Sequence, residues 1–278
     1  LFSLCGLVPV GAYMVVHLVT NASLMNGPAT FQGAVYQIHS LGKILPLVEW
    51  GFIFLPIIFH ACLGVVIIRG GLPNSGTYKT TSNYRYTAQR ATGMIAFLFI
   101  FWHVFHMHGW FHFDWWREGV AHRLGGAQFD PYAAATSLAE AMQASVIVPV
   151  LYAIGVLSCV FHLSNGIWTA GITWGVWTTP AAMGRASRVC LGFGVLLAVV
   201  ATTALWAPLK QEVNAESKGV EYDMYQARLK LHAVTPDEHK EAEHLHVDPR
   251  TESPTAAREE GAFNDKSVQR ETPTKPTS

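Results

Sequence analysis

The sequence has little charge, and its positive and negative side chains cancel. Only 14% of the 278 residues are charged, and 19 basic residues stand against 19 acidic ones, so the formal net charge is zero. A basic surface of the kind that binds nucleic acid is therefore not indicated, and nucleic acid is not an expected partner. Half of the residues are hydrophobic, which is unusual for a soluble domain and indicates a membrane protein.

Cysteine is also scarce. The four cysteines lie in apolar stretches without the paired spacing of a metal site, so we interpret them as packing residues and expect no disulfide framework. They are Cys5, Cys62, Cys159 and Cys190. The sequence shows neither an initiating Met nor a basic segment ahead of its first apolar stretch, which disfavours a cleaved signal peptide. We expect that an N-terminal segment is missing.

Long apolar runs dominate the first three quarters of the chain. Crossing a hydrocarbon core of about 30 Å takes about 20 helical residues, and five stretches are long enough. They lie near residues 1–22, 44–69, 88–110, 142–168 and 186–207. The predicted fold class is therefore all-α: a five-helix transmembrane domain over residues 1–208, followed by a polar C-terminal extension over residues 209–278. The composition of this tail predicts a mobile segment with a helical stretch around residues 222–231.

The short loops indicate the orientation. Basic residues are more frequent in the loops after the second and fourth stretches, namely Arg69, Lys79, Arg85, Arg90, Arg185 and Arg188. The opposite loops carry Lys43, Arg117 and Arg123, partly offset by Asp114, Glu118 and Asp130. Positive charge favours the cytoplasmic side, so this bias predicts a cytoplasmic N-terminus and an outer location for the tail.

Four of the apolar stretches each contain a histidine, and ionisable side chains inside a membrane usually mark a functional site. At a rise of about 1.5 Å per residue, His60 and His162 lie about 12–14 Å from the cytoplasmic ends of their helices. His17 and His103 lie about 8–10 Å from the outer ends. Two pairs at two depths are typical of bis-histidine ligation of two haems, although packing or hydrogen bonding is the better explanation for any one of these histidines taken alone.

Several segments around these histidines resemble the dihaem cytochrome b subunit of succinate:menaquinone oxidoreductases. The segments are Val16–Asn21, Phe59–Gly64, Gln89–Gly93, Phe101–Val104 and Phe161–Trp168, and the resemblance covers about residues 1–207. It implies five transmembrane helices, and it implies two b haems bound by His60 with His162 and by His17 with His103. The pairing that it implies agrees with the pairing by depth.

The resemblance also implies the partners and the reaction. The chain would anchor a flavoprotein subunit with FAD and an iron–sulfur subunit to the bacterial cytoplasmic membrane, in a complex that could form a higher oligomer. It would pass electrons from succinate through the haems to menaquinone without binding succinate itself. The reverse reaction, fumarate reduction, would use the same residues. A haem-free anchor or a proton-relay membrane protein is the alternative from another class.

The positions of several polar residues relative to the four histidines indicate candidate contacts to quinone and haem. Glu49 lies eleven residues before His60, about 16 Å nearer the outer face, where a carboxyl group could exchange quinone protons. His106 lies one helical turn beyond His103 and is a second candidate, although a place among the interfacial aromatic residues is the better explanation. A metal site of His106, His108 and His112 is a weaker alternative. Near the cytoplasmic face, Arg90 is a candidate partner for a haem propionate, and Gln89 and Ser164 are further polar candidates.

Overall fold

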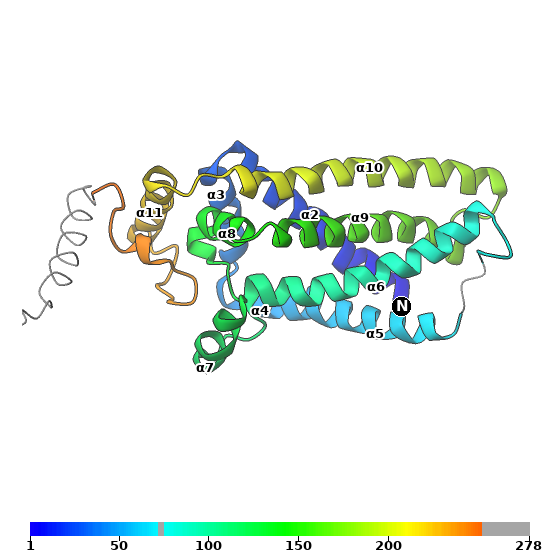
Figure 1. Ribbon diagram of the computed structural model, residues 1–278, viewed down its shortest axis with the longest axis horizontal. Helices are drawn as coiled ribbons and strands as arrows, with labels where there is room; N and C mark the ends of the chain where they lie inside the picture. Colours follow the sequence, from blue (N-terminus) through cyan, green and yellow to red (C-terminus); the bar gives the residue numbers. More distant parts are fainter. Residues whose placement is uncertain (72–74, 252–278) are drawn as a thin grey trace, which may run out of the picture.

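The computed structural model describes residues 1–71 and 75–251, and it shows an elongated helical bundle (Figure 1). Within these residues every regular element is helical, and five helices are long and apolar enough to cross a membrane. The predicted all-α membrane bundle is therefore confirmed. The part of the tail predicted beyond Thr251 lies outside the described residues.

The first two spans are interrupted helices. The first comprises α1 (Phe2–Cys5), η1 (Gly6–Gly11), α2 (Ala12–Ala22) and η2 (Ser23–Asn26). The second comprises η3 (Gly42–Ile44), α4 (Leu45–Val48), η4 (Glu49–Phe54) and α5 (Leu55–Arg69). The segments η1 and η4 are π-helical, and a proline, Pro9 or Pro56, lies within or just after each. A proline cannot donate to the regular helical ladder, so a widened turn beside it is physically reasonable.

The other three spans are continuous helices: α6 (Thr81–His108), α9 (Ile147–Thr173) and α10 (Pro180–Lys210). The predicted start of the third span at residue 88 was too late, because the first turns of α6 are polar and hydropathy does not detect them. Thr80 begins this helix by accepting a hydrogen bond from the backbone N–H of Asn83. The fourth span starts at Ile147 rather than at residue 142, because α8 (Ala134–Gln143) ends just before it.

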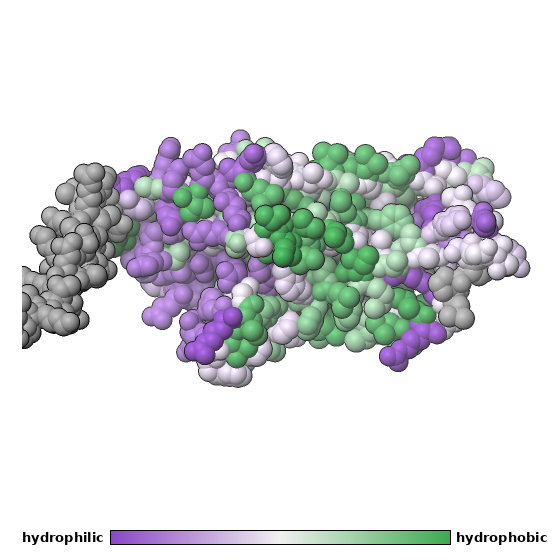
Figure 2. Space-filling model, in the orientation of Figure 1, coloured by the Kyte–Doolittle hydropathy of each residue, from purple (hydrophilic) through white to green (hydrophobic). Residues whose placement is uncertain are grey.

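Helix α9 is the centre of the bundle and packs against α6 on one side and α10 on the other, while α10 also packs against α2. The second span is different, because the apolar window that defines it contains no buried residue, and α5 contacts mainly α1 and η1. On the face seen in Figure 2, a wide apolar band crosses the middle of the bundle, with polar surface toward both ends. The second span is therefore the least enclosed by the rest of the chain.

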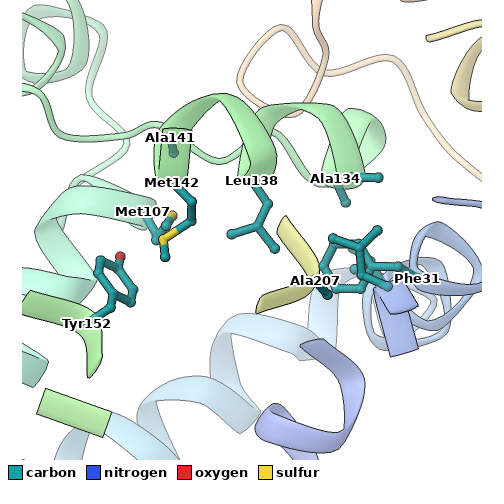
Figure 3. Packing of buried hydrophobic residues seen from close by; sticks show 11 residues of the cluster. Phe31, Met107, Ala134, Leu138, Ala141, Met142, Tyr152 and Ala207 are labelled. Atoms are coloured by element: carbon teal, nitrogen blue, oxygen red, sulfur yellow. The ribbon is translucent and has the colours of Figure 1, made fainter. Parts of the chain in front are cut away.

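The two ends of the bundle differ. One end, called here the capped end, carries α3 (Pro28–His39), α8 and α11 (Ala215–Lys230) as a layer across the spans (Figure 1). The opposite end, called the open end, is where α5 connects to α6 and α9 to α10, and among the described residues it carries no comparable layer of helices. A buried cluster that includes Phe31, Leu138, Met142 and Ala207 joins the layer to the spans (Figure 3).

The start of the polar tail belongs to this layer rather than being mobile, which corrects the expectation from composition. Helix α11 packs on α3 and α8, and its Glu221 is fully buried. The Glu221 carboxylate accepts hydrogen bonds from the backbone N–H groups of Ala135 (2.8 Å) and Thr136 (3.0 Å), which lie in the first turn of α8. His244 contacts the same carboxylate at 3.0 Å. A helix N-terminus favours a negative charge, so α11 and α8 hold each other in place.

Candidate functional site: two histidine pairs

The structure brings the four intramembrane histidines together in the two pairs expected from their depths. The rings of His60 on α5 and His162 on α9 have centroids 6.1 Å apart, with an angle of 80° between their planes. The rings of His17 on α2 and His103 on α6 have centroids 5.9 Å apart, with an angle of 71°. The first is called the open-end pair and the second the capped-end pair.

The separation in each pair matches that of two axial ligands of one metal ion. Two metal–nitrogen bonds of about 2 Å each, together with the ring radii, place opposed imidazole centroids roughly 6 Å apart. The four rings come from four different spans, so no pair is a consequence of helical periodicity within a single helix. All four rings keep intermediate exposure, although they lie within the spans.

Hydrogen bonds at the open-end pair leave the ligating nitrogen of each ring available. Nδ1 of His60 lies 3.0 Å from the carbonyl oxygen of Phe2, whose ring also stacks on the imidazole. Nδ1 of His162 lies 3.1 Å from the carbonyl oxygen of Gln89. A carbonyl can only accept, so Nδ1 carries the proton in both rings and Nε2 has a free lone pair. Metal-binding histidines are usually held in this way.

Two glycines make room for the open-end imidazoles. A Cβ atom on Gly6 would lie 2.6 Å from Cε1 of His60, and a Cβ atom on Gly93 would lie 2.8 Å from Cε1 of His162. Gly93 ends one of the matching segments, Gln89–Gly93, whereas Gly6 lies in none of them. Two other glycines near the histidines do not approach an imidazole ring. Gly11 faces Leu163, and a Cβ atom on Gly64 would meet only the Phe2 side chain, at 3.9 Å.

These contacts also give the separation of the two pairs along the bundle. Gly93 lies beside His162, and His103 follows it on the same helix after ten residues, or about 15 Å. Gly6 lies beside His60, and His17 follows it after eleven residues, or about 16 Å. Two independent spans therefore give nearly the same spacing between the pairs.

The capped-end pair has a side-chain partner that sequence analysis missed. The hydroxyl group of the buried Tyr152 lies 3.1 Å from Nδ1 of His103 and 2.9 Å from Nδ1 of His106. His106 is buried and stacks on Trp102, with ring centroids 5.0 Å apart. It therefore lies beside the capped-end pair, as its spacing from His103 predicted.

The histidines at the end of α6 and just after it do not complete a metal centre among the described residues. His108 and His112 are in contact, with ring centroids 4.4 Å apart, but His106 is bonded to Tyr152 instead. Across residues 1–71 and 75–251, no three His, Cys, Asp or Glu side chains gather in a way that would hold a metal ion. The weaker alternative of a site formed by His106, His108 and His112 is therefore not supported.

The polar residues predicted near the cytoplasmic face take part mainly in contacts within the protein. The Gln89 side chain donates to the carbonyl oxygen of His162 at 3.1 Å and accepts from Asn165 at 2.8 Å. Arg90 donates to the carbonyl oxygens of Ile67 and Gly71 at the end of α5. Gln89 therefore positions His162, whereas Arg90 satisfies the exposed carbonyls of a helix C-terminus.

Ser164 and Glu49, the remaining predicted residues, lie at opposite ends of the spans. Ser164 donates to the carbonyl oxygen of Cys190 at 2.6 Å, which joins α9 to α10. Glu49 begins η4, is half-buried and lies within electrostatic reach of Tyr13. Tyr13 stacks on His17 with centroids 5.5 Å apart. The structure thus brings Glu49 to the level of the capped-end pair.

Burial controls the charge of several groups in the layer at the capped end. It lowers the pKa of His39 and of His112, which favours their neutral forms. It raises the pKa of Asp130 to about 6. The tail contributes further charged groups here, because His239 contacts Asp114 at 3.0 Å and Lys240 contacts Asp237 at 2.6 Å.

The fold and the site define a class of protein: an integral membrane bundle that presents paired imidazoles from neighbouring spans. The chain is 35% identical over 208 residues to the succinate dehydrogenase cytochrome b558 subunit of Bacillus subtilis (strain 168), and the match covers 74% of this chain and 94% of that protein. No protein-family model matches the chain. This similarity shows that the chain belongs to the family of succinate dehydrogenase cytochrome b subunits, which are membrane anchors.

Proposed function

We propose that this subunit binds two b haems, one at each histidine pair, and connects an iron–sulfur subunit to menaquinone. The observation that carries the proposal is the presence of two opposed imidazole pairs at two levels, each with a separation suited to one metal ion. The cytochrome b name of the relative supports haem as the bound group. In this proposal the flavoprotein subunit, with its FAD, and the iron–sulfur subunit are the partners, as in a succinate dehydrogenase.

The residues of the open-end pair fit a haem. His60 and His162 would hold the haem iron through Nε2, and the carbonyl oxygens of Phe2 and Gln89 orient the two rings. Gly6 and Gly93 keep the adjacent helix surfaces clear of both rings. When bound, a haem with two histidine ligands accepts and releases single electrons and has no open axial position for oxygen.

The capped-end pair is where we place the quinone reaction. Reducing a quinone takes protons as well as electrons, and Glu49 places a carboxyl group at this level. Its half-buried position allows exchange of protons with the surface layer. Electrons that move from the open end to this end would travel outward if the N-terminus is cytoplasmic, as the loop charges predict. A charge that crosses the whole membrane gains about 2.3 kcal/mol per 100 mV of membrane potential, and an electron that crosses part of it gains the corresponding fraction.

The difference between the two ends supports this orientation. Among the described residues, the layer formed by α3, α8 and α11 covers the capped end, whereas no such helical layer lies across the open end. A dehydrogenase partner needs a free surface close to an electron acceptor, and the open-end pair lies beneath that surface. We therefore place the iron–sulfur subunit at the open end, in the cytoplasm of a bacterial cell.

The proposal is tested by reduced-minus-oxidised visible spectra of the purified subunit and of histidine variants. His60→Ala and His162→Ala should each abolish the same one of two b-type signals, and His17→Ala and His103→Ala should abolish the other. His122→Ala is a matched control, because His122 lies outside the spans in a surface pair with Glu118. A wild-type subunit without any b-type signal, produced with haem supplied, would contradict the proposal and favour a haem-free anchor.

A further inference from the structure

Tyr152 holds an unusual position beside the capped-end pair. It lies on α9, its side chain is 5% exposed, and its hydroxyl oxygen is within hydrogen-bond distance of two imidazoles. Both contacts are made to Nδ1, at 3.1 Å in His103 and at 2.9 Å in His106. Its ring meets both imidazoles edge-on, at 5.5 and 5.7 Å. A phenol hydroxyl has one proton, so it can donate to only one of the two rings.

The direction of these two hydrogen bonds follows from the chemistry of ligation. An imidazole that binds iron through Nε2 keeps its proton on Nδ1, so His103 must donate to the Tyr152 oxygen. The single Tyr152 proton is then left for Nδ1 of His106, which must accept it and carry its own proton on Nε2. If Tyr152 donated to Nδ1 of His103 instead, the proton of His103 would lie on Nε2, where it would prevent ligation.

We propose that Tyr152 is a positioning residue for the capped-end haem ligand, linking His103 to His106 in a hydrogen-bonded chain that runs in one direction. This inference rests on the proposed function, because the direction is fixed only if His103 binds iron. Tyr152 holds the His103 ring in place and strengthens it as a ligand, since an imidazole whose Nδ1–H is hydrogen-bonded is a better electron donor to a metal. His106 fixes the orientation of the Tyr152 hydroxyl.

The two pairs differ in the kind of group that accepts a hydrogen bond from Nδ1 of a proposed ligand. At the open end, main-chain carbonyls take both Nδ1 protons, and a side-chain substitution cannot remove them. The amide of Asn21 lies 3.5 Å from Nε2 of His17, a distance too long for a good hydrogen bond, and it donates to the His17 carbonyl at 2.8 Å instead. Within the described residues, Tyr152 is thus the side chain that hydrogen-bonds Nδ1 of a proposed ligand, and its replacement removes that bond selectively.

The experiment is a redox titration of the assembled complex, with visible and electron paramagnetic resonance spectra, for wild type and Tyr152→Phe. The capped-end haem is identified as the one lost in His17→Ala. In Tyr152→Phe its midpoint potential should shift upward and its low-spin signal should change, because a weaker ligand stabilises oxidised iron less. The open-end haem should be unchanged and serves as the internal reference.

His106→Phe removes the acceptor of the Tyr152 proton but retains the phenol, and it should produce a smaller shift in the same direction. If Tyr152→Phe loses the capped-end haem, His106→Phe provides the test. An upward shift of the capped-end midpoint potential in His106→Phe supports the hydrogen-bonded chain, and an unchanged potential overturns it. Tyr36→Phe is the matched control. Tyr36 is also buried, but among the described residues its hydroxyl has no hydrogen-bond partner.

Two failures can be told apart. A wild-type complex without haem would refute the proposed function. A complex that contains both haems, and whose capped-end potential and low-spin signal are the same in wild type and Tyr152→Phe, would refute the role of Tyr152 alone.

Discussion

Replacing Gly93 by alanine tests whether the open-end pair needs the space that this glycine leaves. The new Cβ would lie 2.8 Å from Cε1 and 3.1 Å from Nδ1 of His162. Carbon atoms in contact prefer separations of about 3.5–4.0 Å, so the imidazole must move by several tenths of an ångström or more. The Nδ1 bond from His162 to the Gln89 carbonyl limits that movement. We therefore expect the ring to leave its ligating position.

The size of this effect can be estimated. Overpacking of a well-packed site costs about 1–3 kcal/mol, which corresponds to a roughly 5- to 150-fold loss of haem affinity at the open end. Alanine also gains up to about 1 kcal/mol over glycine in helix propensity, which offsets part of the loss in overall stability. Gly64→Ala carries the same gain in propensity without the clash, because its Cβ would meet only Phe2 at 3.9 Å. The comparison between the two variants isolates the steric effect.

The assay is the haem content per subunit together with the visible difference spectrum, measured over a range of added haem. Gly93→Ala should need more haem to fill the open-end site and should retain the capped-end signal, whereas Gly64→Ala should behave as wild type. Equal affinity for haem at the open end in wild type and Gly93→Ala would refute the argument that this glycine accommodates the His162 ring.

Three further predictions concern the capped end. Glu221→Ala should destabilise the layer by about 3 kcal/mol, because it removes charge-assisted hydrogen bonds from the first turn of α8. Faster proteolysis of the tail in Glu221→Ala than in wild type would show the loss of stability. Glu216→Ala is the control, because Glu216 is exposed. Asp130 has a pKa raised from 3.8 to about 6, so its ionisation removes stability as pH rises through this window. The thermal stability of Asp130→Asn relative to wild type should therefore increase between pH 4 and pH 7, and an unchanged difference would contradict the assignment. Glu49→Gln should slow menaquinone reduction while both haem signals remain, and an unaffected rate would exclude Glu49 from the quinone reaction.

The spans and the histidine pairs could be predicted because both depend on distances along single helices. The length of each apolar run sets the span, and the distance of each histidine from its helix end sets its depth. The structure brings His60 to His162 and His17 to His103, as depth alone required. The start of α6 was missed because its first turns are polar, and only the capping contact of Thr80 identifies it.

The features that were not predicted depend on contacts between residues far apart in the sequence. In the sequence, nothing distinguishes Tyr152 from an ordinary core aromatic residue. It reaches His103 only because α9 packs against α6. Arg90, a candidate partner for a haem propionate, donates to main-chain carbonyls at the end of α5, and this contact depends on how the two helices meet. Glu221 lies in a polar tail whose composition predicts mobility. Its burial depends on α8 presenting unpaired N–H groups to it.

The most direct test of the central claim is the ratio of b haem to protein in the purified wild-type subunit. Two opposed imidazole pairs predict two haems per chain, both low-spin, with separate midpoint potentials. A ratio of one, or a single potential that is lost in variants of either pair, would contradict two independent sites. Absence of haem after expression with haem supplied would contradict the account as a whole.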